Sequence, residues 1–146
     1  MAIPENLTAV DLCLNIPGED NSQWFEFIRP LLMDKESRDS FKMPAQYMFK
    51  NIPNISGEED FIAFTVAEMD KYNIRKAMLD VDEDNEVSKK ALERFPDRFF
   101  SSLSVDPNRG MDEVRKIVRL YKKFNLKAVT GFPAGTCPQV PINDKK

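Results

Sequence analysis

The feature that most constrains the fold is a short segment that occurs twice. Residues 71–78 read K-Y-N-I-R-K-A-M, and residues 123–129 read K-F-N-L-K-A-V. In both copies the end of a helical pattern is followed by Asn, which tolerates the left-handed backbone of a helix stop, and then by a strand-like apolar run. A chain that repeats helix, stop and strand is expected to form parallel strands joined by helical crossovers.

The alternation of the two patterns places the individual elements. We expect parallel strands in sequential order, with helices on the outside, at residues 8–15, 74–81, 98–105 and 126–132. Ser56 and Glu59 predict a capping box at the start of the helix before the second strand, and Asn85 is expected to cap the helix after that strand. Residues 7–16 form an apolar run that predicts a buried strand.

The spacing of these units favours an α/β fold, a partial (β/α)8 barrel, although only about half of the roughly 250 residues of such a barrel are present. An open Rossmann-like sheet is disfavoured because no G-x-G-x-x-G follows a strand. We therefore treat residues 1–146 as the N-terminal half of a barrel. Residues 19–55, rich in aromatic residues and proline, form an insertion after the first strand, with short helices expected at residues 22–32 and 35–41. This insertion either packs on the outer face or forms a lid over a pocket.

Composition excludes several classes of function. The net charge is -3 and acids alternate with bases, so no basic stripe indicates a nucleic-acid partner. No apolar run approaches the roughly 20 residues of a membrane span. Two cysteines, Cys13 and Cys137, make no disulfide framework, which predicts a cytoplasmic protein. The chain has no histidine, the commonest metal ligand and the usual base at neutral pH.

Polar and aromatic residues near the strand ends, and one aromatic residue of the insertion, are the candidates for binding a substrate. The candidates are Asp11, Asn15, Trp24, Asp106 and Phe132. A carboxylate inside an apolar run needs partners, so Asp11 is either a structural residue near the strand end or part of a site. A second acidic group follows the second strand and comprises Asp80, Asp82, Glu83 and Asp84. Because acids favour helix N-termini, we interpret this group as the start of a helix and not as a metal cage.

Three segments carry a resemblance to a known family. They are F-K-M-P-A-Q-Y-M-F-K at residues 41–50, P-D-R-F-F at residues 96–100, and F-P-A-G-T-C-P-Q-V-P-I-N-D-K-K at residues 132–146. Together they resemble the amidohydrolase-related family that includes aminocarboxymuconate-semialdehyde decarboxylase. The resemblance implies a distorted (β/α)8 barrel with a divalent metal, such as zinc, at the C-terminal mouth. It also implies hydrolysis, or non-oxidative decarboxylation, of small organic acids.

The first strand departs from the family pattern at the metal ligands. The family carries D-x-H-x-H there, and this chain has Asp11, Leu12, Cys13, Leu14 and Asn15, so Cys13 and Asn15 stand where the two histidines belong. One thiolate and one amide make a poor zinc site. The family's other metal ligands and its catalytic aspartate lie on later strands, so we expect no metal or other cofactor, and no activity, for this chain alone.

Three hypotheses for function follow. The chain is the N-terminal part of an amidohydrolase-type enzyme and needs a complementing C-terminal half, or a metal-independent barrel that binds a small organic acid, or a non-catalytic half barrel that pairs with itself or another chain. In each case the first and fourth strands lack a neighbour on one side. We therefore expect the isolated chain to be a homodimer that completes the barrel or an aggregation-prone species.

Overall fold

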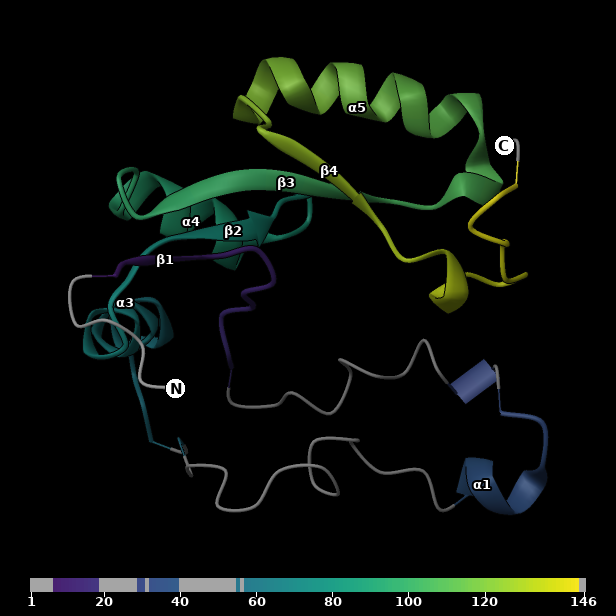
Figure 1. Ribbon diagram of the computed structural model, residues 1–146, viewed down its shortest axis with the longest axis horizontal. Coiled ribbons are helices and arrows are strands. Elements are labelled where there is room, and N and C mark those ends of the chain that lie inside the picture. The colour runs from purple at the N-terminus through teal and green to yellow at the C-terminus, as the bar shows by residue number, and fades with distance from the viewer. Residues whose placement is uncertain (1–6, 19–28, 31, 40–54, 56, 145–146) are drawn as a thin grey trace.

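The computed structural model describes residues 7–18, 29–30, 32–39, 55 and 57–144. Its elements are β1 (Ala9–Asp11), α1 (Lys35–Asp39), α3 (Phe61–Lys71), β2 (Ile74–Asp80), α4 (Glu86–Arg94), β3 (Phe99–Val105), η2 (Pro107–Arg109), α5 (Met111–Phe124), β4 (Ala128–Gly131) and η3 (Pro133–Gly135). The strands form one curled sheet in the order β1-β2-β3-β4, and neighbouring strands are parallel (Figure 1). The predicted α/β arrangement with sequential parallel strands is therefore confirmed.

One face of the sheet is covered by helices, and none of the described helices lies on the other, which we call the open face. Every second side chain along β2 and β3 is buried with residues of α3, α4 and α5, namely Ala77, Leu79, Val81, Phe99 and Leu103. The helices α3, α4 and α5 lie along this face, with α5 over β3 and β4 (Figure 1). Because successive side chains of a strand point to opposite faces, Asp80 and Ser104 lie on the open face.

The repeated segment behaves as its sequence predicts. Asn73 and Asn125 both adopt the left-handed backbone, with φ of 55° and 51°, and each lies between the end of a helix and the next strand. The side chain of Asn85 accepts a hydrogen bond from the Ser88 amide, so it caps α4 as expected. These asparagines fix where a helix stops or starts, and so where the adjoining strand begins or ends.

The start of α3 differs from the prediction. The helix begins at Phe61, and the carboxylate of Asp60 caps it by accepting a hydrogen bond from the Ala63 amide at 3.0 Å. The same carboxylate binds the guanidinium of Arg94 at 2.7 Å. The predicted capping box of Ser56 and Glu59 is therefore wrong, and Ser56 itself lies outside the described residues. An ion pair from Arg94 of α4 also holds the Asp60 carboxylate in place.

The first strand is shorter and more exposed than expected. Only Ala9–Asp11 pairs with β2, and the side chains of Leu7, Val10 and Leu12 are all more than half exposed. The prediction of a buried strand over residues 7–16 is therefore wrong. Part of the apolar pattern reflects packing beyond the strand, because Leu14 and Ile16 follow β1 and pack against the core formed by α3, β2 and α4.

Most of the predicted insertion, residues 19–55, lies outside the described residues, and so does Trp24. The helix α1 falls within the segment that was predicted to be helical at residues 35–41. Across the described parts of the chain, none of the helices has the length and apolar character that crossing a membrane requires.

Candidate functional site

The carboxyl ends of the strands meet at one edge of the sheet, because all four strands are parallel. In α/β proteins this edge carries the ligand sites. Here β2 ends at Asp80, β3 at Val105 and β4 at Gly131. The residues at this edge are thus the first candidates for a functional site.

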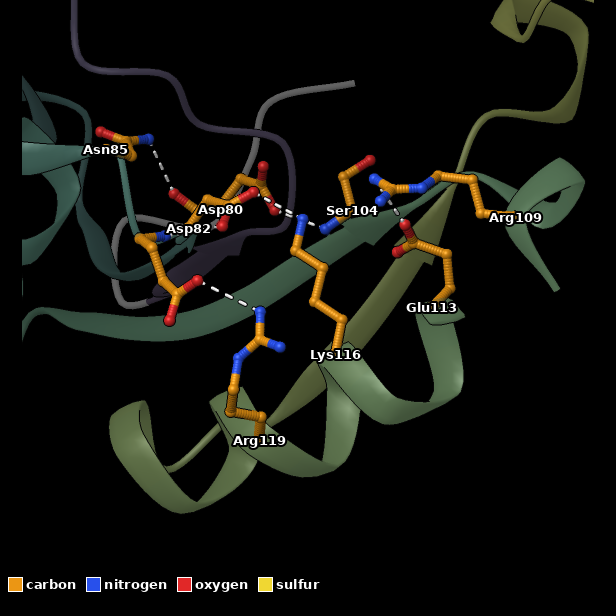
Figure 2. Close-up of polar contacts among 9 residues, drawn as sticks. Asp80, Asp82, Asn85, Ser104, Arg109, Glu113, Lys116 and Arg119 are labelled. Carbon is orange, nitrogen blue, oxygen red and sulfur yellow. Dashed lines mark hydrogen bonds and ion pairs between the residues drawn. The ribbon is translucent and has the colours of Figure 1, made fainter. Parts of the chain in front are cut away.

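Asp80 is built into the edge by the backbone of the neighbouring strand. Val81 donates its amide hydrogen to the carbonyl of Ser102 at 2.8 Å, as in an ordinary parallel ladder. Two residues further along β3, the amide of Ser104 donates to the carboxylate Oδ1 of Asp80 at 2.6 Å (Figure 2). Asn85 also donates its side-chain amide to the Asp80 carbonyl at 3.1 Å. The carboxylate therefore extends the sheet by one hydrogen bond and has a fixed position.

The environment of Asp80 favours its protonated form. Burial raises the pKa of Asp80 above its ordinary value, and the nearby carboxylate of Asp82 adds to this effect. The amide of Ser104 and the charge of Lys116 act in the opposite direction but do not cancel the rise. A half-buried carboxyl group that holds its proton more readily than usual is suited to general acid–base chemistry.

Hydroxyl groups of the two strands that follow β2 lie on the same face of the sheet as Asp80. Ser104 pairs in register with Thr130 of β4, and Asp80 pairs with Ser102 of β3. Ser102 is buried and donates its hydroxyl to the carbonyl of Leu79 at 3.2 Å, so it is already occupied. Ser104 is exposed and Thr130 is half-buried. The open face therefore offers one carboxyl group and two hydroxyl groups on adjacent strands, a set that can bind the oxygens of a small organic acid.

The acidic group after β2 makes ion pairs with a helix more than thirty residues later. Asp82 accepts a hydrogen bond from Lys116 Nζ at 2.6 Å (Figure 2). Glu83 pairs with Arg119 at 3.1 Å. Burial is the largest single effect on the pKa of Asp82 and acts to raise it, but the hydrogen bonds from Lys116 and the Glu83 amide and the charges of Lys116 and Arg119 together hold this pKa below its usual value. The interpretation as helix-start chemistry is therefore incomplete, because Asp82 and Glu83 attach the β2–α4 loop to α5.

A second carboxylate, Glu113, is buried in the first turn of α5. Its side chain is only 7% exposed, and its Oε1 lies 3.2 Å from Arg109. Within the described residues, Oε2 of Glu113 has no hydrogen-bond partner. The position suits a negative charge, because the N-terminus of a helix carries partial positive charge. Arg109 and the helix end therefore stabilise Glu113 together.

Two of the carboxylates predicted from the sequence make local contacts. Asp11 accepts a hydrogen bond from the Cys13 amide at 2.8 Å, and Asp106 accepts one from the Asn108 amide at 2.9 Å, so each carboxylate stabilises its own turn. Asn15 is exposed, and Phe132, just after β4, is 59% exposed. Asp11 and Asp106 are not bonded to each other. The hydrogen bond of Asp11 therefore supports the hypothesis that Asp11 is a structural residue near the strand end.

The described residues do not fit the zinc ion that the resemblance implies. They contain no group of three or more His, Cys, Asp or Glu side chains that could hold a metal. Cys13 is exposed, and the nearby Asp11 is engaged by a backbone amide. No metal-dependent step can therefore be assigned to this part of the chain.

Asp80, Ser104 and Thr130 were not singled out as a site from the sequence. The available signal was Asp80 itself, a carboxylate that closes a strand-like run and is followed by further acids. Its partner Ser104 lies on a different strand, and no local pattern connects the two. Strand register, which only the fold provides, places them together.

Comparison of the chain with protein-family models, with curated proteins and with solved structures finds no match. The resemblance to the amidohydrolase-related family therefore rests on the sequence motifs alone.

Proposed function

We propose that this chain is the front half of an amidohydrolase-type (β/α)8 barrel and acts as a module that forms a site together with further β/α units. The observation that carries the proposal is the sheet itself. Its order is sequential and parallel, polar groups gather at the carboxyl edge, and among the described strands β1 and β4 each have one neighbour only. A sheet of this kind satisfies its edges when more strands join it.

In a completed barrel the open face becomes the interior, and Asp80 lies at the mouth. With its raised pKa, Asp80 acts as the general acid or base in hydrolysis or in non-oxidative decarboxylation of a small organic acid. The hydroxyl groups of Ser104 and Thr130 donate hydrogen bonds to the oxygens of this acid. The chain alone supplies one wall of the site and is inactive without the other.

A second candidate is a non-catalytic half barrel that associates with its own copies. The exposure of apolar side chains at β1 favours it, because Leu7, Val10 and Leu12 would be covered by a strand from another copy. In this case Asp80 and its neighbours bind a small organic acid without a reaction.

Sedimentation velocity over a wide range of protein concentration tests the half-barrel module. We expect the isolated chain to self-associate, or to bind a dye specific for exposed apolar surface, because no described strand pairs with the outer edge of β1 or of β4. A compact monomer that unfolds in one sharp transition and binds no dye would contradict the proposal.

The small-acid site is tested separately by titrating the chain with benzoate and following backbone amide resonances. We expect shifts at Ser104 and Thr130, and weaker shifts when Asp80 is replaced by Ala, because that change removes the carboxyl group that fixes the edge. Shifts that are absent, or that are spread over the whole surface, would contradict the assignment of the site.

A further inference from the structure

A hollow of about 580 Å³ lies at the amino edge of the sheet, the edge opposite to the one that carries Asp80. The ends of α4 and α5 and the starts of β3 and β4 lie together at this edge (Figure 1). We call the space between them the amino-edge hollow. Its volume falls within the range that is typical of sites for small molecules.

The apolar part of the lining comes from three different elements. Leu92 of α4, Phe100 of β3 and Phe124 of α5 all line the hollow, and each of these residues is half-buried. Leu92 and Phe124 also pack against the core between the sheet and α5, which fixes their positions. The amino-edge hollow therefore offers a preformed apolar surface to a ring or a short chain.

The charged part of the lining is almost entirely cationic. Its members are Lys76, Lys89, Lys123, Lys127 and Glu93. The chain as a whole has the opposite balance, with 24 acidic and 21 basic residues. The four lysines come from separate segments, so the fold and not a local run of lysines brings them to one hollow. Like charges in one hollow repel each other, and an anion between them would offset this repulsion.

Two of these lysines have acidic partners outside the hollow. Lys89 pairs with Glu86, which precedes it by three residues. Lys123 lies 3.8 Å from Glu83 and belongs to the last turn of α5, where a cation is favourable. The positions of these two lysines are therefore explained without a ligand.

Lys76 and Lys127 are different, because neither forms an ion pair with a described residue. Lys127 donates a hydrogen bond to the neutral side-chain oxygen of Asn125 at 3.0 Å, and its backbone amide donates to the carbonyl of Ser101 at 2.9 Å. On the other side of β3, the residue after Lys76 pairs in register with Phe99. The two cations therefore come from the segments on either side of the start of β3.

A neighbouring hollow of about 430 Å³ is less suited to an anion. Lys76 lines this hollow too, but Asp70 and Asp97 also line it. Its Arg98 is already paired with Asp70 at 2.7 Å. An anion would meet two carboxylates there and one in the amino-edge hollow.

We propose that the amino-edge hollow binds a small organic anion with an aromatic body, such as an aryl sulfonate or an aryl carboxylate. The anionic group forms charge-assisted hydrogen bonds with Lys76 and Lys127. The aromatic body packs on the apolar part of the lining. This site is separate from the one at the carboxyl edge and does not rest on the proposed function.

Titration of the intact chain with naphthalenesulfonate, followed through backbone amide resonances, tests the proposal. We expect saturable shifts at Phe100, Ser101 and Lys127. Naphthylmethanol has the same rings without the charge and should bind about tenfold more weakly, because it lacks the attraction of two exposed cations. This difference should shrink in about 1 M salt, where charges are screened over about 3 Å.

Matched variants locate the binding. Lys76→Gln and Lys127→Gln should each weaken the binding of naphthalenesulfonate about threefold and leave that of naphthylmethanol unchanged. Lys90→Gln is the control, because Lys90 is exposed on α4 and does not line the hollow, yet its replacement changes the net charge equally. Since Lys127 also binds Asn125, Lys76→Gln alone decides if Lys127→Gln shifts the urea unfolding midpoint.

Three results would overturn the proposal: no binding, equal binding of the two compounds, or equal losses in Lys90→Gln and Lys76→Gln. Shifts confined to Ser104 and Thr130 would place the anion at the carboxyl edge, so that this inference fails and the small-acid site stands. Saturable shifts at Phe100 that persist in Asp80→Ala would support the amino-edge hollow. If benzoate then caused no shift at Ser104 and Thr130, the small-acid site alone would fail.

Discussion

Two substitutions at Asp80 separate its hydrogen bond from its charge. Asp80→Ala removes the acceptor of the Ser104 amide, whose bond to the carboxylate is 2.6 Å long. Ser104 is exposed, so water can replace part of this bond. We therefore expect the free energy of unfolding to fall by about 1–2 kcal/mol at neutral pH. Asp80→Asn keeps an acceptor oxygen and removes the charge that burial disfavours, so its stability should lie within about 0.5 kcal/mol of the parent.

The pH dependence of the Asn variant follows from the direction of the pKa shift. Burial raises the pKa of Asp80 in the folded chain above its ordinary value of 3.8. The folded state therefore binds the proton more tightly than the unfolded state. The stabilisation that this gives is complete below pH 3.8 and is lost as the pH rises through the folded pKa. Asparagine does not bind this proton. As the pH rises from 3.8 through the folded pKa of Asp80, the free energy of unfolding of the Asn variant should therefore increase relative to that of the parent. Above the folded pKa the difference between the two should stay constant.

Urea unfolding of the parent and both variants, at a series of pH values from acidic to neutral, measures these differences. The side-chain carboxyl resonance of Asp80 gives its pKa directly and controls for other groups that titrate. An Asn variant as unstable as the Ala variant at every pH would refute the reasoning. So would an Asp80 that titrates at or below the ordinary value.

Three further predictions concern α5, the start of α3 and metal binding. Leu120→Ala should lower the free energy of unfolding by about 2–5 kcal/mol, because Leu120 is fully buried, whereas Val118→Ala should change it by about 0.5 kcal/mol or less; equal effects in urea would contradict the packing of α5. The hydrogen bond from Arg94, with the Ala63 amide, lowers the pKa of Asp60 to about 2 from 3.8. Asp60 therefore contributes stability above pH 3.8 that is lost as the pH falls toward 2, so Asp60→Asn should unfold at a higher pH in an acid titration followed by circular dichroism; an unchanged midpoint would argue against the cap. Calorimetric titration with zinc should show no stoichiometric binding at neutral pH; micromolar binding would contradict this, and Cys13→Ser would then test the thiolate.

The parts of the fold that depend on neighbours in sequence were predictable. The left-handed helix stops at Asn73 and Asn125 and the cap formed by Asn85 depend on backbone groups a few residues away, so they follow from the sequence. The burial of the first strand was not predictable in this way. An apolar run does not show whether a strand has neighbours on both sides, and Leu14 and Ile16 are apolar because they pack beyond the strand.

The candidate site was less predictable than the fold for the same reason. The partners of Asp80 and Asp82 are Ser104 and Lys116, each more than twenty residues away along the chain. Acidic residues alone predict a helix start equally well, since this is their commonest local role. Only strand register and the orientation of α5 distinguish a carboxylate that extends the sheet from one that binds a helix.

The register of the sheet also implies an order of folding. Pairing β2 with β3 brings residue 77 to residue 99, and pairing β3 with β4 brings residue 102 to residue 128, whereas pairing β1 with β2 closes the chain from residue 9 to residue 74. The last loop is about three times longer, which adds about 1 kcal/mol to the entropy cost of closing it. Closing this loop adds only β1, a strand of three residues whose side chains are largely exposed. The β-α-β units from β2 to β4 therefore form the folding nucleus, and β1 joins last and detaches first, so hydrogen exchange should be fastest along its edge.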